Sequence, residues 1–200
     1  TTADATTGIF SITPSSELSE GLNSLTVTAT DAINNVSTAS SVLSITVDTT
    51  APAQPAITTT TALTSDATPT IEGTAEAGST VTLLVDGVTT GITTTADDNG
   101  VFSMTTPTLA DNNYSLSVSA TDAQGNTSSA SSALSITVDT TAPVAPIFTT
   151  ADTTTNETTP VISGIAEAGS TVELFNGSDS LGTTTADATT GIFSITPSSE

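Results

Sequence analysis

Apolar and hydroxyl side chains alternate with a period of two along several segments of this chain. Residues 114–120 have the sequence Tyr-Ser-Leu-Ser-Val-Ser-Ala, and residues 134–138 have the sequence Leu-Ser-Ile-Thr-Val. Successive side chains of a strand point to opposite faces, so each segment predicts a strand with one apolar and one hydroxyl face. Further strands are predicted at residues 68–74, 79–85, 88–95 and 101–105.

Turn sequences rich in Gly, Asp and Asn separate these segments, and no segment predicts a helix. Short strands with a turn every 8 to 12 residues or so are typical of an immunoglobulin-like sandwich. The sequence therefore predicts an all-β fold built from immunoglobulin-like β-sandwich domains.

The sequence also repeats itself. Val-Asp-Thr-Thr-Ala-Pro at residues 47–52 recurs at residues 138–143, a spacing of 139 − 48 = 91 residues, and residues 75–81 recur as residues 166–172. We expect residues 1–49 to be the C-terminal part of one repeat, residues 50–140 a complete repeat, and residues 141–200 the N-terminal part of the next. Residues 1–17 are identical to residues 184–200, which indicates that two repeat types alternate in an elongated tandem array.

Charge adds a strong constraint, because the chain has 21 Asp and Glu residues and no Lys, Arg or His, for a formal charge of -21. The lack of His, Cys and Lys removes the usual catalytic bases and nucleophiles, so we expect no enzymatic activity. Nucleic-acid binding depends on Lys and Arg and is not expected either. No apolar run predicts insertion into a membrane. Dissolved metal ions are the expected counter-charge, which favours a calcium-dependent extracellular protein.

Three ordered motifs carry a family resemblance. They are residues 47–52, residues 68–81 (Thr-Pro-Thr-Ile-Glu-Gly-Thr-Ala-Glu-Ala-Gly-Ser-Thr-Val) and residues 120–126 (Ala-Thr-Asp-Ala-Gln-Gly-Asn). Together they resemble the bacterial immunoglobulin-like repeats of giant surface adhesins and biofilm-associated proteins. The resemblance implies export to the bacterial cell surface, usually by type I secretion, and a stalk that carries an adhesive tip. Some family members bind calcium at their domain junctions. Residues 31–35 depart from the pattern, because they lack the Gly that the family prefers.

The strand order places three loops at the end of each sandwich that meets the preceding linker. Carboxylates in these loops, together with one from the linker, are expected to converge there. At an effective dielectric near 20, two carboxylates about 5 Å apart repel by about 3 kcal/mol, which favours a Ca²⁺ ion among them. The predicted metal ligands are Asp48, Glu76, Asp97, Asp98 and Asp122, with Asp139, Glu167 and Asp187 at the next junction and Asp31 and Asp4 in the first repeat. The alternative is that these residues only form turns, as Asp commonly does.

The leading functional hypothesis is a stalk of adjacent repeats, stiffened by calcium and by the Pro-containing linker at residues 48–55. One alternative is a ligand-binding adhesive module, although the complete repeat has only Phe102 and Tyr114 as aromatic residues, and both are expected in the core. Another alternative is a matrix filament that self-associates through strand edges, which no Lys guards.

Overall fold

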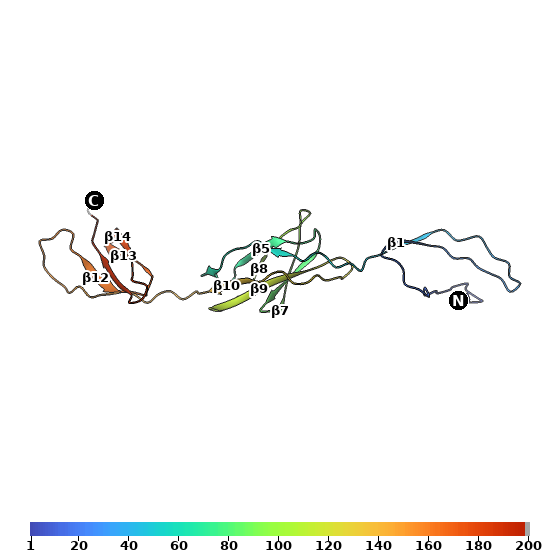
Figure 1. The fold of residues 1–200 in the computed structure, drawn as a ribbon, viewed down its shortest axis with the longest axis horizontal. Helices are drawn as coiled ribbons and strands as arrows, with labels where there is room; N and C mark the ends of the chain where they lie inside the picture. Colours follow the sequence, from blue (N-terminus) through green and yellow to red (C-terminus); the bar gives the residue numbers. More distant parts are fainter. Residues whose placement is uncertain (199–200) are drawn as a thin grey trace. The chain divides into compact units, whose positions relative to one another are not determined.

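The computed structural model describes residues 1–198, so the last two residues of the predicted third piece lie outside the described residues. Over this range the chain forms fifteen strands and no helix, and no segment is a helix long and apolar enough to cross a membrane. The strands group into two compact units, Thr1–Asp139 and Thr140–Glu200. Figure 1 shows the strands along the chain. The three predicted sequence pieces stay a prediction.

Two sheets form the sandwich of the middle repeat, residues 50–140. The smaller sheet has the order β3-β5-β8, and the larger has the order β4-β10-β9-β6-β7. The strands of the smaller sheet are β3 (Ala56–Ile57), β5 (Thr70–Thr74) and β8 (Val101–Thr105). Those of the larger sheet are β4 (Leu63–Thr64), β6 (Thr80–Val85), β7 (Val88–Thr95), β9 (Asn112–Thr121) and β10 (Leu134–Val138).

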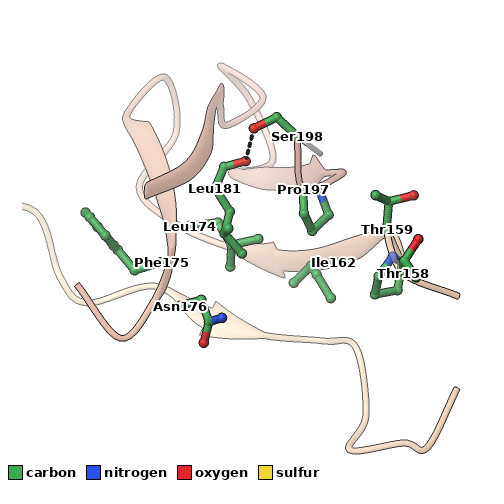
Figure 2. A pocket seen from close by; sticks show the side chains of 10 residues that line it. Thr158, Thr159, Ile162, Leu174, Phe175, Asn176, Leu181, Pro197 and Ser198 are labelled. Atoms are coloured by element: carbon green, nitrogen blue, oxygen red, sulfur yellow. Dashed lines mark hydrogen bonds between the residues drawn. The ribbon is translucent and has the colours of Figure 1, made fainter. Parts of the chain in front are cut away.

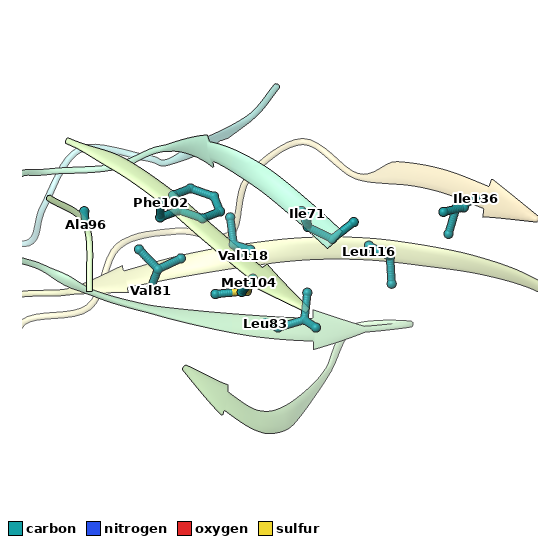
Figure 3. Close-up of a cluster of buried hydrophobic side chains, with 9 residues drawn as sticks. All are labelled: Ile71, Val81, Leu83, Ala96, Phe102, Met104, Leu116, Val118 and Ile136. Carbon is teal, nitrogen blue, oxygen red and sulfur yellow. The ribbon is translucent and has the colours of Figure 1, made fainter. Parts of the chain in front are cut away.

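A core of small apolar side chains lies between these sheets. Ile71 and Phe102 come from the smaller sheet and face Leu83, Leu116 and Val118 of the larger sheet, as Figure 3 shows. Each of these five side chains is at most 2% exposed. The core confirms the inward face that the alternation predicts, including the burial of Phe102. Burial of this kind is the main contribution to the stability of so small a sandwich.

Tyr114 differs from the expectation that it lies in the core. Its ring is half-buried against the core, and its hydroxyl donates a hydrogen bond to the carbonyl oxygen of Ala110 at 3.2 Å. A Tyr at the start of this strand with a bond to the backbone just upstream is a recurrent feature of immunoglobulin-like sandwiches. The hydroxyl therefore stays near the surface because it fastens the loop before β9.

The first strand of the middle repeat changes sheets part-way. β3 pairs antiparallel with β5, whereas β4 pairs parallel with β10, so the same segment closes an edge of both sheets. The Thr-rich sequence between residues 56 and 64 has no regular alternation, and these two short strands are not among the predicted ones.

The first repeat contributes a hairpin. β1 (Gly21–Leu25) pairs antiparallel with β2 (Leu43–Val47), and we call residues 21–47 the β1–β2 hairpin. Residues 1–20 form no strand, and Phe10 is 50% exposed.

We call residues 141–198 the third repeat. One sheet has the order β11-β12-β15, and β13 and β14 form a separate hairpin. Val172, Ala186, Phe193 and Ile195 form its small buried core. The strands are β11 (Ile147–Phe148), β12 (Ile162–Ile165), β13 (Thr171–Asn176), β14 (Asp179–Thr185) and β15 (Ile192–Ile195).

Candidate functional site at the domain junction

Three loops gather at one end of the middle sandwich: β5–β6, β7–β8 and β9–β10. The Ala75 N–H donates to the carbonyl oxygen of Gly100 at 2.8 Å, which joins the first two loops. The third loop follows Thr121, which pairs with Thr80 at the same end of the sheet. These are the loops that the strand order placed together, and they carry Glu76, Asp97, Asp98 and Asp122.

The Asp122 carboxylate is engaged in its own turn. Its Oδ1 accepts hydrogen bonds from the N–H groups of Gln124 at 2.9 Å and Asn126 at 2.8 Å, and its Oδ2 accepts one from the side-chain amide of Asn126 at 2.8 Å. Desolvation raises the pKa of Asp122, but the hydrogen bonds from Asn126, Gln124 and Gly125 together outweigh it and lower the pKa. The loop therefore holds this carboxylate in its ionised form.

Asn126 connects this loop to the chain that arrives from the first repeat. Its Nδ2 donates to Asp122 Oδ2 and also to the carbonyl oxygen of Asp48, at 3.1 Å. A second contact fastens the same segment, since Gln54 Nε2 donates to the carbonyl oxygen of Ala130. Asp48 and Asp122 are thus neighbours, as predicted. The Asn126 side-chain amide links them by binding the backbone carbonyl of Asp48 and the carboxylate of Asp122.

Glu20 is a junction residue that the sequence analysis missed. Its Oε2 accepts hydrogen bonds from Thr49 N at 3.1 Å and Thr49 Oγ1 at 2.7 Å, and its Oε1 accepts one from Thr50 Oγ1 at 3.3 Å. The Thr49 hydroxyl and N–H lower the pKa of Glu20, and the Asp48 side chain adds a smaller lowering. The sequence could have indicated this position, because an acidic residue recurs there one repeat later: Asp111 follows Glu20 by 111 − 20 = 91 residues.

The comparisons with known proteins agree with this architecture. A family model described as a bacterial Ig-like domain matches residues 1–49 and residues 54–140. The chain belongs to the bacterial Ig-like domain family. The match confirms the all-β, immunoglobulin-like fold, and apart from residue 140 both matched segments lie in the unit Thr1–Asp139.

Two solved structures are more remotely similar to this bacterial Ig-like chain. The fibronectin(III)-like modules of Clostridium thermocellum CbhA are 22% identical with a TM-score of 0.32, over 42% of this chain and 95% of that one. The BSP domain structure of a biofilm associated protein is 20% identical with a TM-score of 0.30, over 73% of this chain and 25% of that one. No curated protein matches the chain. The family assignment rests on the sequence match alone.

Four of the other predicted ligands in these Ig-like domains also accept hydrogen bonds within their own turns. Asp97 Oδ1 accepts from the Val101 N–H at 2.8 Å, Asp187 Oδ1 from Thr190 N at 2.8 Å, and Asp4 Oδ1 from Thr7 N at 2.7 Å. In each case the named N–H is the largest cause that lowers the pKa of the carboxyl. Asp31 repeats the Asp122 arrangement through Asn35.

Within residues 1–198, no group of three or more acidic side chains is arranged to hold a metal ion. Glu76 and Glu167 contribute backbone carbonyls to turns, through bonds from Ser79 N and Ser170 N, and the Asp139 N–H donates to the carbonyl oxygen of Thr64. Asp98 lies in the same β7–β8 loop as Asp97. The four-carboxylate arrangement is not assembled by these side chains, so the calcium site stays a prediction.

Proposed function

We propose that these repeats are spacers in a large extracellular bacterial surface adhesin, exported by type I secretion, that serves cell adhesion and biofilm formation. The observation that carries the proposal is the fastened junction. Asn126 and Gln54 hold the segment that follows the β1–β2 hairpin against the middle sandwich. A spacer needs such contacts, because a free linker would let successive domains reorient.

The charge supports the same role. With no cation on the chain and a formal charge of -21, the repeats repel one another and other polyanions. Repulsion between modules opposes compaction of a stalk. It also means that the stalk itself would not adhere to anionic surfaces.

Calcium stiffening is a separate part of the proposal. Asp48 and Asp122, with Glu20 added, are the acidic residues that flank the fastened linker. Because these side chains do not form a cage of three, a bound Ca²⁺ would take most of its six to eight oxygens from backbone carbonyls and water. Extracellular modules typically bind calcium with Kd values of about 10⁻⁴ to 10⁻³ M, so millimolar calcium is the relevant condition.

Small-angle scattering and thermal unfolding of the chain, in millimolar calcium and in EDTA, test both parts. A stiffening ion should raise both the maximum dimension and the Tm. Binding at 100-fold above the Kd adds about 2.7 kcal/mol per site to the free energy of unfolding. Asp122→Asn should remove the calcium response. Asp66→Asn is the matched control, because Asp66 caps a turn elsewhere through the Thr68 N–H at 2.8 Å.

Identical scattering and Tm in calcium and in EDTA would refute calcium stiffening, and the spacer role would not depend on it. Specific binding of the chain to a glycan or a cell-surface protein would instead make it an adhesive module. A glycan array and a cell-binding assay measure that binding directly.

A further inference from the structure

Two Asn-Gly sequences occur in this chain, Asn99-Gly100 in the β7–β8 loop and Asn176-Gly177 in the turn between β13 and β14. In an Asn-Gly sequence the main-chain nitrogen of Gly can approach the side-chain amide of Asn with little hindrance, because Gly has no Cβ and rotates freely. The two sites have the same reacting groups in different surroundings. They can therefore be compared within one molecule.

The surroundings of Asn99 hold its peptide bond to Gly100 in place. Asp97 Oδ1 accepts hydrogen bonds from the N–H groups of Asn99 at 2.9 Å and Val101 at 2.8 Å, and the Gly100 N–H donates to the carbonyl oxygen of Asp97 at 2.8 Å. Gly100 is buried, and a Cβ added to it would lie 2.5 Å from the carbonyl oxygen of Ala75. The Gly100 nitrogen therefore cannot turn toward the Asn99 side chain without breaking these contacts.

The surroundings of Asn176 are open. Asn176 pairs with Asp179 across the two-residue turn Gly177-Ser178, and Gly177 has a φ of +64°. Asn176 and Gly177 are both exposed, and a Cβ added to Gly177 would meet no atom within 4 Å. Among the described residues no hydrogen bond holds the Asn176 side chain, which is drawn in Figure 2.

The exposure of this turn is a property of the sandwich. Asp86 and Gly87 occupy the positions of Gly177 and Ser178 in the middle repeat, 91 residues earlier. They are exposed as well, although all the strands of the middle sandwich surround them.

We propose that Asn176 is a site of spontaneous deamidation, and that the loop around Asn99 protects the other Asn-Gly sequence from the same reaction. The Gly177 nitrogen attacks Cγ of Asn176 and forms a C–N bond, its proton passes to the departing Nδ2, and ammonia leaves behind a cyclic succinimide. Water then opens either ring carbonyl and gives Asp or isoaspartate. One water is consumed and one ammonia released, with no enzyme, metal or oxidant.

Each product adds a carboxylate to a hairpin that already carries Asp179. Asn176 lies directly opposite Asp179, and like charges directly opposite each other destabilise paired strands. Isoaspartate also lengthens the main chain by one methylene group, which disturbs the register of this pair. The modified chain therefore has a looser β13–β14 hairpin.

Peptide mapping by mass spectrometry measures both sites in one sample of the full chain. The chain is incubated in mildly alkaline buffer and then digested with pepsin, because it has no Lys or Arg for trypsin and because acid stops the reaction. Deamidation changes the mass of the peptide that contains the modified Asn. The same incubation in urea is the control, since unfolding gives both Asn-Gly sequences the same freedom.

In the folded chain we expect Asn176 to react several-fold faster than Asn99, and in urea the two rates should converge. Equal rates in the folded chain, or a faster reaction at Asn99, would overturn the proposal. So would an unreacted Asn176 in a folded chain whose urea control has reacted.

Two variants test the local causes. Gly177→Ala should slow the reaction at Asn176 several-fold and leave the rate at Asn99 unchanged. Asp97→Ala removes the carboxylate that binds the Asn99 N–H, so it should raise the rate at Asn99 toward that at Asn176, in a variant whose melting transition shows that it is still folded. An unchanged rate at Asn99 in that variant would refute protection by the loop.

Hydrogen exchange measures the loosening of the hairpin. Asn176→Asp reproduces one product and should speed amide exchange in β13 and β14 relative to the parent. Adding Asp179→Asn to this variant should restore slow exchange, because it removes the opposed charge. Exchange that Asn176→Asp leaves unchanged, or that Asp179→Asn does not restore, would refute the effect of the charge on the hairpin.

Discussion

Replacing Asn126 by Ala should loosen the junction without unfolding the middle sandwich. The variant keeps the backbone N–H that donates to Asp122 and loses the amide that donates to the Asp48 carbonyl at 3.1 Å. A neutral hydrogen bond contributes about 1 kcal/mol net, so the equilibrium between docked and undocked linker should shift about fivefold. The Gln54 contact to Ala130 remains and limits the effect.

Spin labels can measure this change, since engineered cysteines are the only thiols in the chain. Labels at Thr46→Cys on β2 and Ser103→Cys on β8 report the distance between the hairpin and the middle sandwich, and both positions are exposed. Pulsed electron resonance should give a broader distance distribution for Asn126→Ala than for the parent. The Tm of the middle sandwich should change little.

Asn35→Ala is the matched control. Asn35 Nδ2 donates to Asp31 Oδ2 at 2.8 Å, as Asn126 Nδ2 does to Asp122, but Asn35 lies in the β1–β2 hairpin and this bond stays within its own turn. It should leave the distribution unchanged. The reasoning is refuted if both variants broaden the distribution equally, or if Asn126→Ala leaves it as narrow as the parent.

Three further predictions concern the stability of the middle sandwich, measured by urea unfolding. Gly73→Ala should cost about 1–3 kcal/mol or more, because its Cβ would lie 2.4 Å from the Phe102 ring and 2.2 Å from a backbone oxygen; an unchanged midpoint would contradict this packing. Gly125→Ala should lower the free energy of unfolding by about 1 kcal/mol, because the φ of Gly125 is +94° while an added Cβ would meet no atom within 4 Å. Gly125→Asn should cost less, because Asn34 holds the equivalent position at φ 69°, and equal losses would refute the backbone explanation. The Val101 N–H lowers the pKa of Asp97 below its unfolded value, so the bond's contribution to the free energy of unfolding is full at neutral pH and is lost as the pH falls through the folded pKa. Asp97→Ala should therefore make the free energy of unfolding fall less steeply at acid pH than in the parent. Parallel plots of this free energy against pH for the two proteins would disprove the linkage.

The strands could be predicted where one face is buried and the other is solvated. β7, β8 and β10 have the predicted bounds, and β9 extends the predicted segment at both ends. β3 and β4 could not be predicted, because each has only two residues and is defined by the neighbour it pairs with. Pattern within a segment is informative only when the segment is long enough to show one.

One comparison within the chain isolates the effect of context. Residues 1–15 are identical to residues 184–198, yet Ile192–Ile195 forms β15 against β12, whereas Ile9–Ile12 forms no strand. Phe193 is 2% exposed and the identical Phe10 is 50% exposed. The same sequence is therefore a strand only where a partner strand and an apolar face are present. No reading of the segment alone could separate the two outcomes.

The position of the junction could be predicted from the sequence, but the hydrogen-bond partners of its carboxylates could not. The loops meet where the strand order put them, but their carboxylates bind N–H groups two to four residues away, as Asp97 and Asp122 do. Such local bonds need no distant partner and keep like charges apart, so they compete with convergence on one point.

The donors at the junction follow from the composition. A chain without Lys, Arg, His or Trp has only Asn and Gln as side-chain N–H donors. The two side chains that fasten the linker to the middle sandwich are Asn126 and Gln54. The absence of cations, which first suggested a metal ion between the repeats, therefore also explains why neutral amides make the direct contacts there.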